Sequence, residues 1–252
     1  MNGKRPYKLP EPLLCSADKE INMTLIDEYI RKHEERMPRY RYLENLYKGF
    51  HDVFRLPEKE SWKPDNRLAV NFPRYITETF LGYAYGIPVK KSHPDEKIKD
   101  AILEFDRDND ISDQEYELAK KCCIYGHAFE YFYQDEEAKT KTVVCNPKEL
   151  FVVYDDTVKS RALFAVRYGK KDDNVTRDGE ILTRTEIIPF DGEKMQESIP
   201  NPYGRINCVE YVLNDERIGL YEEVAGMVET YNRVIGEKAN DVDSFAEAYL
   251  AV

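Results

Sequence analysis

The chain has 252 residues, of which 42% are hydrophobic and 34% charged, a composition typical of a soluble globular protein with one large or two modest domains. Its formal net charge is −11, which disfavours tight binding to DNA because an acidic chain displaces no counterions from phosphates, although it could still surround nucleic acid without holding it. No run of about 18 apolar residues occurs, so we expect no membrane-spanning helix and no membrane partner.

The first half of the chain is predicted to be helical after a flexible arm. Residues 1–23 contain three prolines and little hydrophobic periodicity, so we expect an extended or disordered arm. Apolar residues then recur at helical spacing in five segments that begin near residues 24, 38, 71, 94 and 112, and the fifth ends near Gly126. A loop rich in proline and charge is expected over residues 57–66.

The residue types and their spacing change after Gly126. Short segments rich in aromatic and β-branched residues follow, separated by Gly, Asn, Asp and Pro. These segments are 127–133, 142–145, 150–156, 162–168, 180–190 and 206–212. They predict a central antiparallel β region.

The last stretch, residues 219–252, predicts one long helix. Its apolar residues alternate three- and four-residue steps over more than four repeats, a heptad pattern that gives a narrow apolar seam. We expect the seam to pack against the body or a neighbouring subunit through Val224, Val228, Tyr231, Ile235, Val242, Phe245 and Tyr249. Such a helix would run roughly 50 Å, longer than a compact domain of this size needs.

The element order predicts an α+β fold with N-terminal helices, a central antiparallel β region and a long C-terminal helix. We divide the chain into a flexible arm (1–23), an α+β body (24–218) and the long helix (219–252).

Few residues in the sequence indicate a catalytic or metal-binding site. Asp155 and Asp156 end a strand and could hold metal ions in a nuclease, although such a pair is also typical of a turn. His127 follows Cys122 and Cys123, but adjacent cysteines on a helix point to different faces, and no third group orients the histidine. The five cysteines lack CxxC spacing, which indicates reduced thiols in a cytosolic setting. No nucleotide-binding glycine loop is present, so we expect no enzyme, cofactor or metal site.

Short stretches over residues 24–252 form a recognisable series. In chain order they are Tyr47-Lys-Gly49-Phe-His51, Asn66-Arg67, Val70-Asn71, Tyr75-Ile76, Gly82-Tyr83-Ala-Tyr-Gly86-Ile-Pro88-Val89, Tyr125-Gly126-His-Ala128, Pro147, Phe151-Val-Val-Tyr154-Asp155, Val166-Arg167-Tyr168, Asn201-x-x-Gly204, Val209-Glu210, Tyr231-Asn232, Ala239-Asn240-Asp241 and Phe245-Ala-Glu-Ala248-Tyr249-Leu250. Each stretch is short, and their order is the specific signal. In this order they resemble the portal proteins of tailed bacteriophages, of the siphophage type found with Gram-positive hosts.

The resemblance implies a homo-oligomeric ring, usually dodecameric, at one capsid vertex, with double-stranded DNA passing through its axial channel. The body would be the peripheral wing, and the last stretch the helix leading to the stem. Implied partners are capsid and scaffolding proteins, the terminase motor and head-completion proteins, in the virion and, during assembly, in the host cytoplasm. Family members continue into a clip, a returning stem helix and a crown, so we expect a C-terminally truncated portal, a fragment or a prophage copy.

Charge agrees with this resemblance. Four acidic residues lie away from the predicted seam and are candidates to face the channel, namely Glu222, Glu229, Asp243 and Glu247. A channel that must let DNA slide should not bind phosphate, and an acidic wall would repel it. Two alternatives stay open: a metal-dependent nuclease that uses Asp155 and Asp156, and an interaction module whose long helix forms an ordinary coiled coil.

Overall fold

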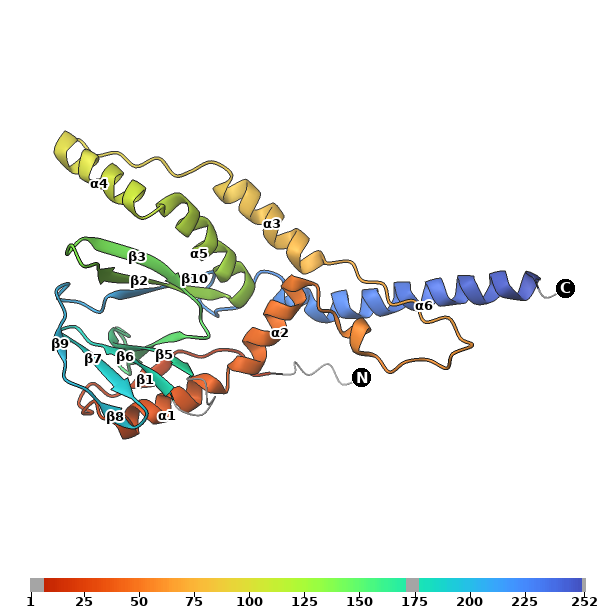
Figure 1. Ribbon diagram of the computed structural model, residues 1–252, viewed down its shortest axis with the longest axis horizontal. Helices are drawn as coiled ribbons and strands as arrows, with labels where there is room; N and C mark the ends of the chain where they lie inside the picture. The colour runs from red at the N-terminus through yellow and green to blue at the C-terminus, as the bar shows by residue number, and fades with distance from the viewer. Residues whose placement is uncertain (1–6, 171–176, 251–252) are drawn as a thin grey trace.

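The computed structural model describes residues 7–170 and 177–250, with side chains described up to residue 246. It consists of a body of helices and two β-sheets, from which one long helix, α6 (Ala225–Leu250), projects (Figure 1). With 26 residues, α6 is about 39 Å long at about 1.5 Å per residue. The predicted α+β class and its order of elements are confirmed.

All five predicted N-terminal helices are present. They are α1 (Met23–Glu34), α2 (Met37–Lys48), α3 (Phe72–Tyr85), α4 (Glu96–Asp108) and α5 (Ile111–Tyr125). Side-chain caps and glycines set several of their ends: Asn71 accepts a hydrogen bond from the N–H of Arg74 at the start of α3, and α2 ends at Gly49 in the left-handed conformation (φ 85°). Two short 3-10 helices, Asp52–Arg55 and Glu222–Val224, precede α3 and α6.

The β region forms two sheets. The larger has the order β1-β4-β5-β6-β7-β8, with β9 also paired to β7, and the smaller has the order β10-β2-β3. The strands are β1 (Leu13–Cys15), β2 (His127–Gln134), β3 (Thr140–Cys145), β4 (Leu150–Asp155), β5 (Ala162–Lys170), β6 (Arg177–Leu182), β7 (Glu186–Asp191), β8 (Lys194–Met195), β9 (Ile199–Pro200) and β10 (Cys208–Val212). The predicted antiparallel region is confirmed, and among the strands of the described residues only β1 and β4 pair in parallel.

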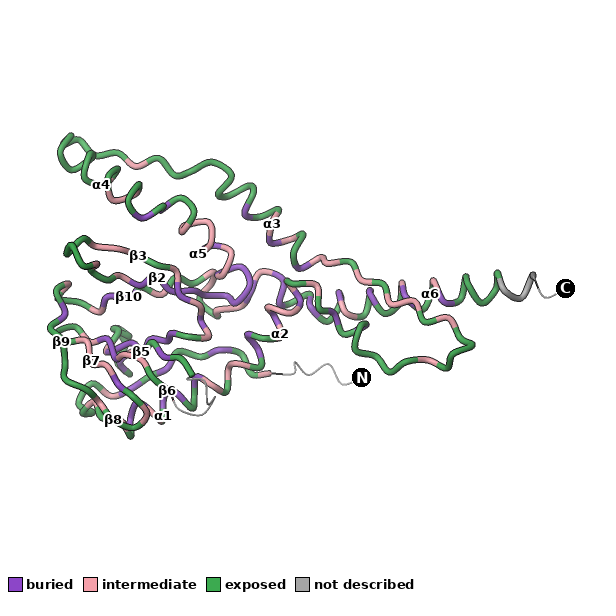
Figure 2. Tube along the Cα trace, viewed as in Figure 1, coloured by how far each residue is buried: buried purple, intermediate pink, exposed green. Residues whose placement is uncertain are grey.

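Strand β4 lies at the centre of the core. Because side chains alternate along a strand, Phe151 and Val153 pack on α1, while Leu150 and Val152 pack toward the smaller sheet. The continuous apolar run of this strand therefore reflects burial on both faces. Figure 2 shows the buried residues gathered in the sheets, α1, α2 and α5, whereas α4 has no buried residue.

Two sequence expectations need correction in the β region. Part of the predicted arm is strand β1, where Leu13 and Cys15 are buried beside β4; three residues are too few to show a period, and residues 1–6 lie outside the described chain. The single strand expected over 180–190 is a hairpin of β6 and β7. The hydroxyl of Thr183 accepts from the N–H of Glu186 and closes the turn.

The long helix begins later than predicted. Residues 219–221 lead into a turn beside the end of α5, and the N–H of Leu220 donates to the carbonyl of Cys123 at 2.7 Å. A Cβ at Gly219 would lie 2.6 Å from the carbonyl oxygen of Ile124, so only glycine allows this close approach. The helix therefore starts at Ala225 instead of residue 219.

Candidate functional site

Helix α6 is joined to the body by a buried ion pair. Arg39 of α2 and Glu222 are 1% and 4% exposed, and the Arg39 Nε lies 2.8 Å from Oε1 of Glu222, with a second contact from Nη2 to Oε2. Glu222 also accepts from the N–H of Gly219, and Arg39 donates to the carbonyl of Arg217. Glu222 was predicted to face a channel. That prediction is wrong, because its charge is neutralised inside the protein.

A second buried carboxylate lies nearby. Glu210 of β10 accepts from both the Nε and Nη2 of Arg217, at 2.8 and 2.9 Å, and from the hydroxyl of Tyr154. Its Oε1 lies 2.7 Å from Nδ1 of His127, whose Nε2 lies 2.8 Å from the hydroxyl of Tyr40. Burial alone would raise the pKa of Glu210, but the hydrogen bonds from Arg217 and His127 hold that pKa well below its usual range. This network ties α2 to β2, β4 and β10.

The hydrogen bonds of His127 and Cys122 bear on whether the two residues could form a catalytic cysteine–histidine pair. Both ring nitrogens of His127 are within hydrogen-bond distance of the network. The Cys122 thiol donates to the carbonyl of Tyr211 at 3.5 Å, and burial raises its pKa to about 12, so it remains protonated at neutral pH. His127 and Cys122 therefore act as structural residues here.

The paired carboxylates lie in a turn. Asp155 accepts from both the N–H and the hydroxyl of Thr157, at 3.1 and 2.6 Å, which is the geometry of an Asx turn. No group of three or more His, Cys, Asp or Glu side chains that could hold a metal ion occurs among the described residues. The turn interpretation fits Asp155.

The segment between α2 and α3, residues 49–71, forms a strap that runs out along α6 and returns (Figure 1). The side chain of Asn232 accepts from the N–H of Val70 at 2.8 Å, and that of Asn240 accepts from the N–H of Asn66 at 2.6 Å. Between them, a Cβ at Gly236 would lie 2.8 Å from the carbonyl oxygen of Asn66. The face of α6 that the strap covers is therefore polar and small.

Two predicted channel residues also contact the strap. Glu229 lies 3.1 Å from Nδ1 of His51 and accepts from the N–H of Asp52. Asp243 accepts from the side chain of Asn66. The side chain of the fourth, Glu247, lies outside the described residues. Within this chain, Glu229 and Asp243 hold the strap, a role that hydrophobic spacing could not indicate.

The predicted seam is divided between two faces of α6. Val228 is buried and Ile235 half-buried, whereas Val224, Tyr231, Val242 and Phe245 are exposed by 37%, 47%, 62% and 69%. The sequence analysis missed Met227 and Val234, which are 72% and 56% exposed on the same side. The prediction that these four residues pack on the body is therefore wrong. They face solvent, because the strap covers the opposite side of α6. The Tyr249 side chain lies outside the described residues.

We define the α6 stripe as these exposed apolar residues: Val224, Met227, Tyr231, Val234, Val242 and Phe245. Its first four members follow three- and four-residue steps, as in the seam of a coiled coil. The site is thus a long helix, fixed at its base by buried charge, held on one face by polar contacts and apolar on another. This arrangement is suited to assembly.

Comparison with known proteins identifies the family to which this chain belongs. The family described as phage portal protein, SPP1 Gp6-like, matches residues 26–252, and the chain belongs to this family. Among curated proteins, the portal protein of Bacillus phage SPP1 is 21% identical over 277 residues, an alignment that covers 97% of this chain and 54% of that protein. The chain thus spans about half the length of the curated relative it matches. Among the described residues, no helix has the length and hydropathy needed to cross a membrane.

Proposed function

We propose that this chain forms the wing and the first stem helix of a ring-shaped portal at a capsid vertex, through which DNA enters and leaves the capsid. The observation that carries the proposal, beside the family, is the α6 stripe. Five of its six exposed apolar residues belong to α6, the helix that projects from the body (Figure 1), and Val224 directly precedes that helix. Burying apolar surface contributes about 25 cal/mol per Å², so the stripe favours a contact with another helix.

A ring follows from the geometry of the contact. The strap covers the face of α6 opposite the stripe, so the two sides of the helix differ in chemistry. Two unlike surfaces favour a head-to-tail contact between copies, and such a contact closes into a ring when its rotation divides a full turn. We propose a homo-oligomer of this kind, with the dodecamer of the family as the expected size.

The negative charge of α6 favours passage of DNA over binding of DNA. Helix α6 has five acidic and two basic residues, a net charge of −3. A duct wall of this sign forms few salt links to phosphate, and each such link would slow a sliding duplex. Of the predicted channel residues, Glu247 and Asp243 remain candidates for this role, since Asp243 is exposed although it also contacts Asn66 of the strap. Glu222 is excluded by its burial, and Glu229 is half-buried against the strap.

The proposed partners follow from the same role. They are capsid and scaffolding proteins, a terminase that supplies the motor, and head-completion proteins, with the assembled protein in the virion. In this role the chain would be structural, and a separate protein would hydrolyse ATP.

Negative-stain electron microscopy of this chain and of its full-length parent tests the proposal. We expect closed rings. Small dimers whose amount depends on concentration would instead support a coiled-coil interaction module and would exclude the portal ring.

A further inference from the structure

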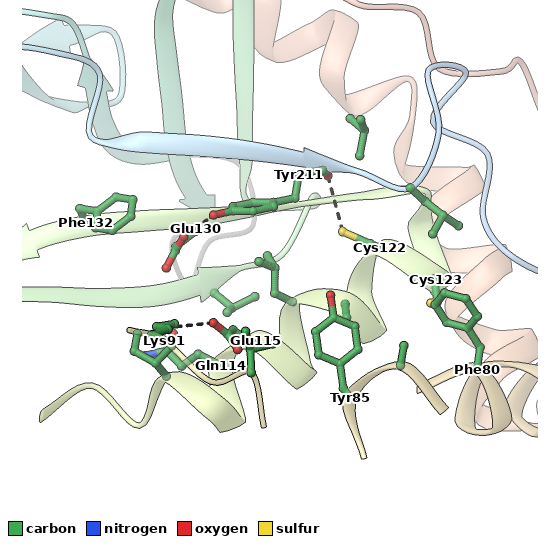
Figure 3. Close-up of a pocket in the computed structure, with 18 of the residues that line it drawn as sticks. Phe80, Tyr85, Lys91, Gln114, Glu115, Cys122, Cys123, Glu130, Phe132 and Tyr211 are labelled. Atoms are coloured by element: carbon green, nitrogen blue, oxygen red, sulfur yellow. Dashed lines mark hydrogen bonds and ion pairs between the residues drawn. The ribbon is translucent and has the colours of Figure 1, made fainter. Parts of the chain in front are cut away.

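A cleft of about 740 Å³ lies between the helices α3 to α5 and the smaller sheet (Figure 3). Its walls are mostly apolar: Phe80 and Tyr85 come from α3, Leu118 from α5, and Phe132 and Val144 from the sheet. Carboxylates lie among them, since Glu115 and Glu130 also line the cleft. The cleft is separate from the stripe and the base of α6.

Helix α4 lies beside this cleft, to which it contributes Phe105, and two of its other apolar residues are uncovered. Ile98 and Leu103 are 46% and 42% exposed, and no residue of α4 is buried. The helix is tied down by polar contacts: Lys91 pairs with Asp106 of α4 and Glu115 of α5. Apolar side chains that the body leaves uncovered indicate a surface for a partner.

The same helices concentrate negative charge. Residues 95–125 include ten acidic and five basic residues, a net charge of −5 within a chain of net charge −11. On α4, Asp100, Glu104 and Asp108 are exposed. We call these three carboxylates, on the helix beside the cleft, the rim. An acidic rim beside an apolar cleft complements a partner that is basic and apolar at once, because the charges attract and the cleft removes apolar side chains from water.

We propose that this acidic cleft, formed by the cleft and the exposed face of α4, binds a basic amphipathic segment of a partner protein. The segment would place apolar side chains in the cleft and lysine or arginine against the rim. DNA is disfavoured because the rim repels phosphate. A second copy of this chain is disfavoured as the occupant because it is itself acidic overall. The proposal does not depend on ring formation.

A synthetic peptide tests the proposal with the whole chain. The probe is a fluorescein-labelled helix of about 18 residues, long enough for five turns, with leucine on one face and lysine on the other. A scrambled peptide of the same composition controls for charge alone. We expect the amphipathic peptide to bind at low salt, at least about tenfold more tightly than the scrambled one, with an affinity that falls as salt rises.

Two variants separate the rim from the cleft. The triple variant Asp100→Asn, Glu104→Gln, Asp108→Asn removes rim charge on α4. The variant Ala84→Trp adds bulk at an exposed residue that lines the cleft. We expect each to weaken peptide binding by about tenfold or more in fluorescence anisotropy, with unchanged circular dichroism.

The matched control removes three exposed carboxylates elsewhere, by Glu186→Gln, Glu193→Gln and Glu197→Gln on or next to strands β7 to β9. It should bind the peptide as the wild type does. Equal losses in the rim and control variants would mean attraction by net charge alone and would overturn the proposal. So would binding of the scrambled peptide as tight as that of the amphipathic one. If the rim variant lowered the oligomer size of the protein alone and left peptide binding unchanged, the occupant would be a second copy and the proposal would be wrong.

Discussion

At the scale of single residues, buried charge decides how α6 is held. Arg39 and Glu222 are 183 positions apart in the sequence but lie together with almost no solvent contact. Taking one ion from water costs several kcal/mol, which only a partner and further hydrogen bonds offset. The Nη2 of Arg39 and both carboxylate oxygens of Glu222 make such bonds. The pair therefore fixes one geometry at the base of the helix.

We expect Glu222→Gln to destabilise the protein by about 3–5 kcal/mol, because Arg39 would keep a buried charge without a counter-ion. Urea unfolding followed by circular dichroism measures the change. Asp241→Asn, on an exposed position of the same helix, is the control and should stay within about 0.5 kcal/mol of the wild type. Equal stability of the two variants would show that the ion pair contributes little.

Glu210 predicts a pH dependence. Its pKa is depressed in the folded protein, so its ionised form contributes stability at pH values above the unfolded pKa, and this contribution is lost as pH falls below it. Glu210→Gln lacks the contribution at every pH. We expect the variant to be clearly less stable than the wild type at pH 7, and the difference to shrink progressively below about pH 4.

Unfolding by urea at a series of pH values measures this difference. Glu186→Gln, an exposed carboxylate on β7, should show no such convergence. A gap between wild type and Glu210→Gln that stays constant from pH 7 to pH 3 would contradict the assignment of the buried carboxylate as ionised.

At the scale of elements, hydrophobic spacing located the helices and most strands, because each long element buries one apolar face. It predicted that α6 exists but not which of its faces is buried. The residues of α6 that the strap contacts include Asn232, Gly236 and Asn240, which no apolar pattern can mark as buried. Met227 and Val234 were visible as apolar residues, and only the position of the strap shows that they share the exposed face. Strand β1 was not predicted, because three residues are too few to show an alternating pattern.

The strap predicts a change in local stability. Asn232→Ala with Asn240→Ala leaves the N–H groups of Val70 and Asn66 without their partners, and two such bonds contribute about 2 kcal/mol in total. If trypsin cleaves the transiently opened strap at Lys59 or Arg67, the rate should rise by roughly 30-fold. Gel electrophoresis of a time course measures it.

The control for this experiment is Ser244→Ala. The Ser244 hydroxyl donates to the carbonyl of Asn240 within α6, a bond that does not involve the strap, so cleavage should stay at the wild-type rate. Unchanged cleavage in the double asparagine variant would show that other contacts, such as the pair of Lys59 with Glu237, hold the strap.

At the scale of the whole molecule, one long helix connects the fold to the proposed assembly. The body has its own buried core in the two sheets and α1, so it does not need the outer part of α6 for stability. The apolar residues of the stripe are thus available for contacts between copies. A charge on the stripe should consequently affect assembly while the body remains folded.

We expect Tyr231→Asp with Val234→Asp in the full-length parent to prevent ring formation, because each aspartate would place a charge in an apolar contact between subunits. Thr230→Asp with Ser244→Asp adds the same charge to exposed positions of α6 outside the stripe, and that variant should still form rings. Negative-stain images and sedimentation velocity measure assembly, and circular dichroism checks that both variants fold. Rings of normal size from the Tyr231 and Val234 variant would remove the stripe from the subunit interface, whereas loss of rings in both variants would indicate an effect of added charge instead of position.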